Sequence, residues 1–385
     1  MKILHTSDWH LGHSLYGHDR TEEQDSMLRQ IIDLAEQESP DLFLLCGDIF
    51  HTATPSAFVQ QSFANAVMEL RRVCPEMAIV AIAGNHDSGT RHEIFRSPWE
   101  AMNVYAIGNV DKENPEYNIV KLSDKCFVLA IPYIHERYMP ADWIARAMET
   151  IEAQNETHLP VIIAAHTTIL GCDYSGHEQS TERTVGGIDS LDIAAFGAGY
   201  DYLALGHIHK RQSLSGRVHY SGTPLAVSFD ERYEHSVTMV DIGEHGALPL
   251  LRHVAISNPK PLVTLPTTGF ASWNEAKDCL ENFPCDISAY IRLNVLVDNY
   301  LPVNANFEAL DIASKKMCTF CQINARRKEV ERDIGKVMTI AEFQQETPQT
   351  LLKRYMQEKG ITYDDETEGM MKEVISLLNE DKHNQ

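Results

Sequence analysis

The sequence predicts an α/β fold, because short apolar runs typical of buried strands alternate with helical stretches over its first two-thirds. The strand-like runs lie at residues 2–6, 42–46, 78–82, 127–131, 161–165 and 202–205. The composition agrees, since 43% hydrophobic and 23% charged residues are typical of a globular protein. A chain of 385 residues is long enough for two or three domains and a large core.

Two helices are predicted between the first three runs. An apolar stripe marks the first of them: Leu28, Ile31, Leu34 and Ala35. Thr21 and Gln24 have the spacing of a capping box at its start. The second helix is predicted to begin at Thr54-Pro55, with proline at the first helical position, and to run to about Cys74.

The composition changes near Ile256, where the stretch ISNPKPLVTLP carries three prolines and is typical of a linker or an edge segment. A small α+β pattern follows, with helices expected over 271–283 and 306–315 and strands over 289–297 and 317–324. Two amphipathic helices are expected over 347–360 and 368–380. They are too small to form a core, so we expect them to dock on another surface. The predicted domains are therefore 1–255, 256–340 and a helical tail over 341–385.

The charge balance limits the possible partners. With 33 Lys+Arg and 55 Asp+Glu, the net charge is −22, which excludes nucleic-acid binding through broad basic patches. Positive charge must then be local or come from a partner. The chain has no apolar run of membrane-spanning length and no secretory h-region at its start, so a cytoplasmic protein with no membrane partner is expected. Its eight cysteines are interpreted as buried thiols.

Five short polar motifs follow the predicted strands. They are Asp8-Trp9-His10, Gly47-Asp48, Gly84-Asn85-His86-Asp87, His166 and Gly206-His207-Ile208-His209. Ligands of α/β sheets bind beyond the carboxyl ends of the strands, so these motifs are expected to converge on one sheet edge. The three glycines are expected to allow sharp turns and close backbone approach there.

The residue types in these motifs suit a site for two divalent metals. The candidate ligands offer oxygen and imidazole donors without thiolate: Asp8, His10, Asp48, Asn85, His166, His207 and His209. This donor set favours Mn²⁺, Fe²⁺ or Zn²⁺ over an all-oxygen Mg²⁺ site. In D-x-H and H-x-H, an extended backbone would point both side chains the same way. Asp48 is the predicted bridge between metals about 3.5–4 Å apart.

Such a site predicts hydrolysis of a phosphodiester. Two divalent ions and two aspartates leave a local charge of about +2, which attracts a phosphate within an acidic protein. Metals of this kind supply hydroxide near neutral pH and stabilise charge on the phosphoryl oxygens. His86 is the candidate general acid for the leaving oxygen. Each motif alone is weak, because an isolated histidine is more often structural; five in order, each at a strand end, are specific.

The ordered set resembles the calcineurin-like metallophosphoesterase superfamily, and within it the nuclease subunits of bacterial SbcCD complexes. The matching segments are ILHTSDWHLG (3–12), GDIFHTATPS (47–56), AGNHDS (83–88), ALGHIHKRQ (204–212) and YSGTPLAVSFDE (220–231). The segment GDIFHT differs from the GDxxDRG pattern of the Ser/Thr phosphatases in this superfamily and argues against them. The resemblance implies a four-layer αββα β-sandwich.

The resemblance also implies a role for each site residue. One metal would be held by Asp8, His10 and His209, and the other by Asn85, His166 and His207, with Asp48 bridging and Mn²⁺ as the expected ion. His86 would be the catalytic histidine, and His51 a second active-site histidine.

The same resemblance implies a DNA nuclease that works with an SbcC-type ATPase. Together they would form an ATP-dependent double-strand exonuclease and a single-strand or hairpin endonuclease in DNA repair, recombination and replication. A homodimer within a heterotetramer is expected. The α+β domain would be a cap facing DNA, and the tail would bind the coiled-coil base of the ATPase. The basic run Arg326-Arg327-Lys328 is interpreted either as a DNA contact or as a solvated strand end.

The sequence allows two other functions. A stand-alone phosphodiesterase for small phosphodiesters is disfavoured by the extra 130 residues after Ala255 and by the tail. A metal-free binding scaffold is disfavoured by the intact ligand set.

Four further side chains have expected roles outside the ligand set. His5 is expected in the core or behind the ligands, and Trp9 and Leu11 beneath the site. Asp87 is expected to orient His86 or its loop.

The C-x-x-C pair Cys318 and Cys321 is a conceivable zinc motif. Residues three apart in a strand face opposite sides, so buried thiols are the favoured interpretation.

Overall fold

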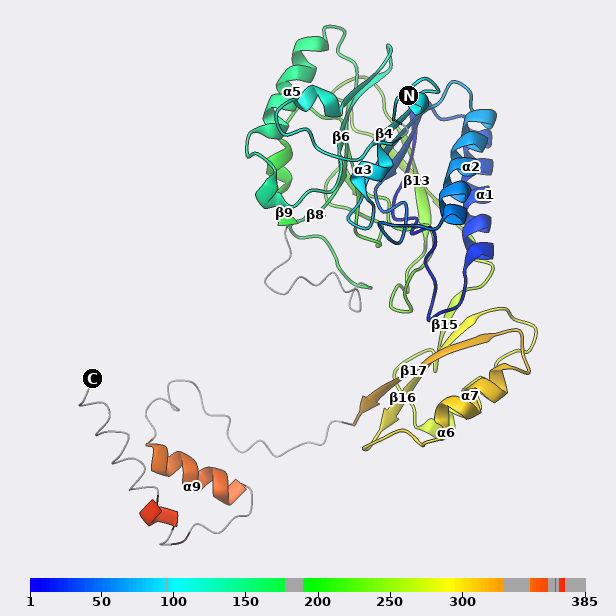
Figure 1. The fold of residues 1–385 in the computed structure, drawn as a ribbon, viewed down its shortest axis with the longest axis vertical. Helices are drawn as coiled ribbons and strands as arrows, with labels where there is room; N and C mark the ends of the chain where they lie inside the picture. Colours follow the sequence, from blue (N-terminus) through cyan, green and yellow to red (C-terminus); the bar gives the residue numbers. More distant parts are fainter. Residues whose placement is uncertain (95, 177–189, 329–346, 359–363, 365–366, 371–385) are drawn as a thin grey trace. The chain divides into compact units, whose positions relative to one another are not determined.

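We describe the protein from a computed structural model, which covers residues 1–94, 96–176, 190–328, 347–358, 364 and 367–370 (Figure 1). The chain divides into two compact units, Met1–Arg327 and Lys328–Gln385. Within the described residues, every helix is too short or too polar to cross a lipid bilayer.

Two six-stranded sheets form the large domain. The first has the order β14-β13-β1-β2-β3-β4 and contains β1 (Lys2–Thr6), β2 (Leu42–Cys46), β3 (Ala78–Ile82), β4 (Val104–Ile107), β13 (Ser236–Asp241) and β14 (Leu250–Ala255). The second has the order β11-β12-β10-β7-β6-β5 and contains β5 (Ile119–Leu122), β6 (Cys126–Ile131), β7 (Val161–His166), β10 (Tyr202–Gly206), β11 (Gln212–Ser213) and β12 (Val218–Tyr220). The strands that precede the polar motifs are parallel to their sheet neighbours, so their carboxyl ends share an edge.

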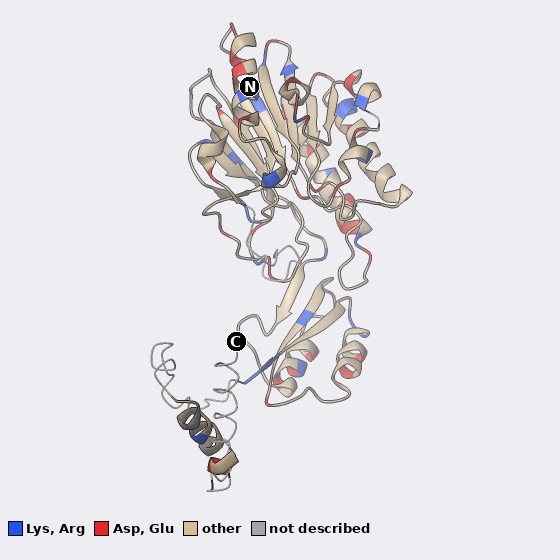
Figure 2. Cartoon of the chain, turned by 60° about the vertical axis from the view of Figure 1, so that its left-hand side comes forward, with Lys and Arg blue, Asp and Glu red and all other residues tan. Residues whose placement is uncertain are grey.

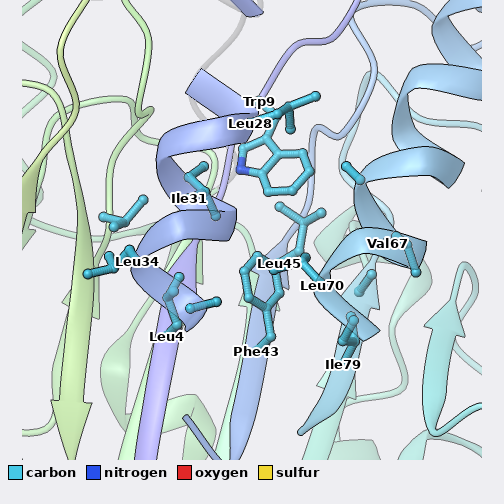
Figure 3. Packing of buried hydrophobic residues seen from close by; sticks show 14 of the residues in the cluster. Leu4, Trp9, Leu28, Ile31, Leu34, Phe43, Leu45, Val67, Leu70 and Ile79 are labelled. Atoms are coloured by element: carbon cyan, nitrogen blue, oxygen red, sulfur yellow. The ribbon is translucent and has the colours of Figure 1, made fainter. Parts of the chain in front are cut away.

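The two sheets pack face to face, and helices cover both outer faces. Residues alternate along each strand: Leu44 of β2 lies in the core between the sheets, and its neighbours Phe43 and Leu45 face the helices α1 (Thr21–Glu38) and α2 (Ala57–Val73). Figure 3 shows this outer core. Helix α5 (Trp143–Gln154) and η3 (Ile193–Phe196) pack on the second sheet. The four-layer αββα architecture is therefore confirmed.

Helix α1 begins at Thr21, where the predicted helical stretch starts, but the predicted capping box is wrong. The residue before α1 is Arg20, with no side-chain cap, so the Thr21–Gln24 capping box does not form. The Gln24 side chain instead accepts from the Gly12 amide at 3.0 Å and donates to the His10 carbonyl at 3.3 Å. It therefore holds the loop after β1 rather than its own helix.

Helix α2 begins two residues after Pro55, because Ser56 supplies the cap. The Ser56 side chain accepts a hydrogen bond from the amide of Val59, and the first helical residue is Ala57. Shorter elements complete the large domain: α3 (Gly89–His92), α4 (Arg96–Glu100), η1 (Pro115–Asn118), η2 (Glu136–Tyr138), β8 (Thr168–Ile169) and β9 (Ser190–Leu191).

The α+β segment has a sheet and a core of its own. Three parallel strands run in the order β15-β16-β17, with bounds β15 (Leu262–Leu265), β16 (Tyr290–Val297) and β17 (Thr319–Arg327). Helices α6 (Trp273–Glu281) and α7 (Ala305–Ala313) pack through Leu280 and Ala309 against the same core as Ile291 and Leu293. The proline-rich stretch supplies edge strand β15, one of the two structures expected for it. We call residues 256–327 the cap segment.

The cysteine pair does not converge. Cys318 lies in the core of the cap segment, and Cys321 packs with Leu15 and Phe229 of the large domain. The strand has an irregular register here, since Ile291 pairs with Phe320 and the next residue of β16 pairs with Gln322. The eight cysteines are free thiols, and five of them are buried as expected, but Cys279 and Cys321 are half-buried and Cys285 is exposed.

In the second unit, α9 (Pro348–Glu358) confirms the first predicted tail helix. Residues 367–370 are helical, and the rest of the second predicted helix lies outside the described residues.

Candidate metal centre

The structure brings the seven predicted ligands together at the carboxyl ends of five strands. The loops after β1, β2, β3 and β10 and the last residue of β7 supply them. Backbone hydrogen bonds join two of these loops: the Asp8 amide donates to the Gly47 carbonyl at 2.9 Å, and the His10 amide to the Asp48 carbonyl at 3.0 Å. The loops after the first two strands therefore hold each other in position.

One group of possible ligand atoms comes from the loops after β1 and β10. Donor atoms of Asp8, His10 and His209 lie within 4.8 Å of one another, and all three residues are buried. The Nε2 atoms of His10 and His209 are 3.1 Å apart. We call this group site 1.

A second group draws on β7 and on the loops after β2, β3 and β10. Donor atoms of Asp48, His166 and His207 lie within 4.8 Å of one another. The Oδ1 atom of Asn85 lies 2.9 Å from His166 Nε2 and 3.0 Å from His207 Nδ1. We call this group, with Asn85, site 2.

Asp48 lies between the two groups. Its Oδ2 atom is 3.7 Å from His10 Nε2 in site 1 and 3.5 Å from His166 Nε2 in site 2. A carboxylate in this place can contact both sites at once.

Several of these residues have a left-handed backbone. Asp8, His10, Asp48 and His207 have φ values of 55°, 45°, 49° and 94°. They are four of the nine non-glycine residues with positive φ in the described chain. The expectation of an extended backbone in D-x-H and H-x-H is therefore wrong, and His207 and His209 contribute to different sites. Such conformations cost about 1–3 kcal/mol each and cluster at functional sites.

Three glycines allow the close packing behind the ligands. A Cβ at Gly47 would overlap the His166 ring, one at Gly84 would overlap Asp48, and one at Gly206 would overlap a backbone carbonyl of β2. Gly47 also has a φ of +87°, whereas the other two glycines do not need a positive φ. The glycines therefore serve the approach of neighbouring groups more than sharp turns.

The buried charges are balanced within the cluster. Burial raises the pKa of Asp8 to about 6. Burial would also raise the pKa of Asp48, but the charges of His166 and His10 outweigh it and hold that pKa well below its usual range. Burial opposes protonation of His166, yet Asp48 raises its pKa to about 10. A buried carboxylate–imidazole arrangement of this kind favours bound positive charge.

The two predicted catalytic histidines lie beside site 1. The His86 amide donates to Asp48 Oδ1 at 2.9 Å, and its Nδ1 donates to the His51 carbonyl at 2.9 Å. The two rings stack with centroids 5.6 Å apart, and the His86 ring lies 4.9 Å from that of His10. Because Nδ1 of His86 bonds to a carbonyl, Nε2 is the ring nitrogen that can meet a ligand.

Sequence reasoning missed the residues that support the ligands. Glu231 accepts a hydrogen bond from Nδ1 of His209 at 2.9 Å, and Thr223 donates to the Asp8 carbonyl at 2.8 Å. Both lie in the segment 220–231 that carries the resemblance, and that segment was the signal that could have found them. Asp87 orients its loop rather than the His86 ring, since it accepts amide hydrogen bonds from Ile49, Phe50 and Gly84.

The remaining expectations about neighbouring residues hold. Trp9 and Leu11 are buried in the core beneath the site. His5 is fully buried and bonds through Nδ1 to the Tyr202 hydroxyl at 2.9 Å.

The donor set fits divalent metal ions. His166 donates from Nδ1 to the Cys46 carbonyl at 2.8 Å, which directs Nε2 toward the site, where a bound metal ion would take the place of its proton. Glu231 orients His209 in the same way, through a hydrogen bond to Nδ1. Nε2 of His209 lies 3.1 Å from Nε2 of His10. Converging imidazole nitrogens and carboxylates form an arrangement that a cation satisfies.

Known proteins are similar to this chain over most of its length. The calcineurin-like phosphoesterase family matches residues 1–211, and the chain belongs to that family. The SbcD component of the SbcCD nuclease from Rhodobacter capsulatus is 30% identical over 81% of this chain and 84% of its own length. The protein of the same name from Bacillus subtilis is 29% identical over 78% of this chain and 80% of its own. Within the family, the chain therefore belongs to the SbcD-type nucleases.

The solved structure of TT1561 from Thermus thermophilus aligns with a TM-score of 0.41 and 14% identity, over 66% of this chain and 99% of that chain.

The chain is thus a metal-dependent phosphodiester hydrolase of the nuclease type. Its family uses divalent metals, and the described Asp and His clusters can bind them.

Proposed function

We propose that the protein is the DNA-cleaving component of an SbcCD-type complex and that it works with two Mn²⁺ ions. The observation that carries this proposal is the pair of ligand groups on either side of Asp48. An active site with two metals and a shared carboxylate suits in-line displacement at phosphorus.

The proposed ligands follow the two groups. Site 1 holds one ion through Asp8, His10 and His209, and site 2 holds the other through Asn85, His166 and His207, with Asp48 between them. When bound, the ions lower the pKa of an attacking water and stabilise charge on the phosphoryl oxygens.

His86 and His51 act on the substrate rather than on the metals in this proposal. His86 is held by two hydrogen bonds, one to Asp48 and one to the His51 carbonyl, so its ring is fixed beside site 1. From there a protonated Nε2 donates to the oxygen that leaves phosphorus. The stacked ring of His51 restricts the motion of His86 and faces the same space.

The DNA and the ATPase contact other parts of the chain in this proposal. Residues 256–340 form the cap that faces DNA, and β17 ends in Arg326 and Arg327, the basic segment drawn blue in Figure 2. Their guanidinium groups lie over the rings of Phe270 and Tyr300, at 6.0 and 5.5 Å from the centroids. Of the two rings, Tyr300 is exposed and Phe270 is half-buried. Arginine beside such aromatic rings suits a nucleic-acid backbone and its bases.

The tail over residues 341–385 is proposed to bind the coiled-coil base of an SbcC-type ATPase. The relatives are named as parts of an SbcCD nuclease, which supports such a partner. With a net charge of −22, the chain would rely on that partner for most of its DNA affinity. We propose a cytoplasmic heterotetramer built on a homodimer of this chain.

The test is nuclease activity of the purified chain on linear duplex and hairpin DNA, with Mn²⁺ or Mg²⁺. We expect Mn²⁺-dependent cleavage that is lost in Asp48→Ala and His86→Gln. His158→Asn is the matched control, because His158 is an exposed histidine with a φ of 52° that asparagine tolerates. Turnover of bis-p-nitrophenyl phosphate with no cleavage of either DNA would contradict the proposal and favour a phosphodiesterase of small substrates.

A further inference from the structure

Glu231 is a buried carboxylate behind the metal centre. Its side chain is 1% exposed, and Oε1 accepts the hydrogen bond from Nδ1 of His209 at 2.9 Å. The other oxygen, Oε2, accepts from the Val227 amide at 3.2 Å. A carboxylate bonded to the outer nitrogen of a metal-binding histidine fixes the ring orientation and raises its basicity.

The residue before Glu231 is held by the cap segment. Asp230 forms an ion pair with Arg292 of β16, at 2.7 Å between Oδ1 and Nη1. The Arg292 side chain is 1% exposed, so water screens this pair little. Arg292 is itself anchored in the cap segment, where its Nε donates to Thr264 Oγ1 of β15 at 3.2 Å.

Phe229 completes the contact. Its carbonyl accepts from Nη2 of Arg292 at 3.1 Å, and the guanidinium lies 5.1 Å from the centre of its ring. The Phe229 side chain also packs with Tyr290 of β16 and Leu15 of the large domain, and all three are buried. Phe229 is therefore in contact with groups that belong to different parts of the fold.

We propose that residues 229–231 are a mechanical link between the cap segment and metal site 1, in which Glu231 is the positioning residue for His209. Phe229 and Asp230 are fixed by Arg292, and Glu231 follows them directly in the chain. One planar peptide bond joins Asp230 to Glu231 and fixes the distance between their Cα atoms, so a displacement of Arg292 that moves Asp230 also moves Glu231. The orientation of His209 then depends on where the cap segment sits.

This inference rests on the proposed function, since it assumes that His209 holds a metal ion. It goes further by assigning roles to Glu231, Asp230 and Arg292.

The link is selective, because other groups orient the histidines of site 2. The Cys46 carbonyl accepts from Nδ1 of His166 at 2.8 Å, and Asn85 Oδ1 lies within 3.0 Å of a ring nitrogen of both His166 and His207. A disturbed link should therefore weaken site 1 and leave site 2 unchanged.

The first experiment titrates the metal-free full chain with Mn²⁺ alone, followed by isothermal calorimetry and by the electron paramagnetic resonance signal of unbound Mn²⁺. Wild type should bind two ions. We expect Glu231→Ala to weaken one of them by about 10–100-fold and to leave the other unchanged. Glu231→Gln keeps an acceptor oxygen at the same place and should restore most of the loss.

Glu234→Ala is the matched control, because it removes a carboxylate only three residues after Glu231. The Glu234 side chain is 64% exposed and pairs with Arg211 at 3.4 Å, and it forms no hydrogen bond to a proposed ligand among the described contacts. It should leave both Mn²⁺ affinities at the wild-type value.

The second experiment tests the cap side of the link. Arg292→Gln combined with Asp230→Asn replaces the buried ion pair by two amides and leaves no unpaired charge. We expect this double variant to weaken the same Mn²⁺ site about tenfold. When the double variant is combined with Glu231→Ala, the site should become little weaker than in Glu231→Ala alone. The reason is that the effects of substitutions within one chain of contacts do not add. Lys277→Gln, which breaks the surface pair of the cap helices with Glu308, should have no effect.

The outcomes separate the two proposals. If wild type binds no Mn²⁺, the proposed metal centre is wrong. If wild type binds two ions and folded Glu231→Ala binds both as tightly, only the positioning role is wrong. If Glu231→Ala weakens site 1 while the amide pair does not, or if their effects add fully, Glu231 acts without the cap and the link is wrong. Circular dichroism of each variant confirms that it is folded.

Discussion

Two clusters of histidines in the large domain differ in their position along the strands, in backbone conformation and in hydrogen-bond partners. The edge histidines His10, His166, His207 and His209 lie at the carboxyl ends of strands among two aspartates. The strand histidines His5, His219 and His253 lie within β1, β12 and β14. The first cluster has left-handed backbone at two of its four histidines, and the second lies in regular sheet.

Their hydrogen-bond partners differ as well. His219 bonds to the hydroxyls of Ser213 at 2.8 Å and Thr238 at 3.3 Å, and Thr238 lies 3.2 Å from His253 Nδ1. No cluster of potential metal ligands in the described part of the chain includes a strand histidine. A count of histidines therefore says little about function. The carboxylates between the rings and the strained backbone distinguish a site from a core.

The pKa values of one histidine from each cluster, His166 and His219, shift in opposite directions. Asp48 raises the pKa of His166 to about 10, against the effect of burial. Burial, with smaller contributions from the charges of His253 and Arg211, lowers the pKa of His219 to about 3. Within the edge cluster, His166 thus holds positive charge beside Asp48, while burial lowers the pKa of His10, as it does those of the strand histidines.

Asp48→Ala is the strongest test of the difference between the two histidine clusters, because it removes the carboxylate between the two sites. Charge stabilisation by a metal pair amounts to several kcal/mol, and each 1.36 kcal/mol is tenfold in rate, so we expect kcat on duplex DNA to fall by about 10⁴-fold or more. Steady-state cleavage with Mn²⁺ measures it. His219→Gln should keep near wild-type activity. Equal losses of activity in Asp48→Ala and His219→Gln would contradict the proposed difference between the two histidine clusters.

His86→Gln separates catalysis from metal binding within the edge cluster. Loss of a general acid costs about 10²–10⁴-fold, so kcat should fall by that amount. The Mn²⁺ affinities should stay unchanged, because His86 contacts Asp48 through its backbone amide, which glutamine keeps. Calorimetry beside the cleavage assay checks both. A weakened metal site would make His86 a ligand instead.

Metal binding should stabilise the fold only through the edge cluster. At Mn²⁺ concentrations about 100 times Kd, a ligand that binds only the native state adds about 2.7 kcal/mol to the free energy of unfolding. Thermal unfolding with and without Mn²⁺ measures the gain. It should persist in His219→Gln and be largely lost in Asp48→Ala. A gain lost in His219→Gln would show that the strand cluster binds the metal.

The sequence predicts the buried strands β1, β2 and β3 better than the exposed edge strand β14. The strands β1, β2 and β3 are mostly or wholly buried, and their predicted bounds are confirmed. The edge strand β14 was missed, because its residues are mostly exposed and carry no long apolar run. Strand pairing between distant segments, such as β1 with β13, leaves no local signal.

In the candidate site, too, features with a local sequence signal could be predicted, and features set by contacts between distant segments could not. Its ligand types and strand-end positions can be predicted from motifs, because each motif is local. The backbone at Asp8 and His10 could not, because backbone hydrogen bonds to the loop after β2 shape it. Glu231 was missed because it follows His209 only after β11 and β12, and the fold alone brings the two side chains together.

The smallest expected effect concerns the strand histidines and acid stability. The pKa of His219 is about 3 in the folded protein and about 6.5 in an unfolded chain, so the unfolded chain takes up a proton first as the pH falls. The stability from this neutral histidine is present above about pH 6.5 and is lost progressively between about pH 6.5 and 3. At about pH 5 the loss amounts to about 2 kcal/mol.

Urea denaturation of wild type and His219→Gln at about pH 7 and pH 5 measures this contribution. Glutamine does not titrate, so the fall in the free energy of unfolding over this range should be about 2 kcal/mol smaller in the variant. His158→Asn, at an exposed histidine, should follow wild type. If the variant loses as much stability as wild type, His219 is not neutral in the fold. The contrast with His166 of the edge cluster would then rest on backbone geometry and carboxylate neighbours alone, without the difference in charge.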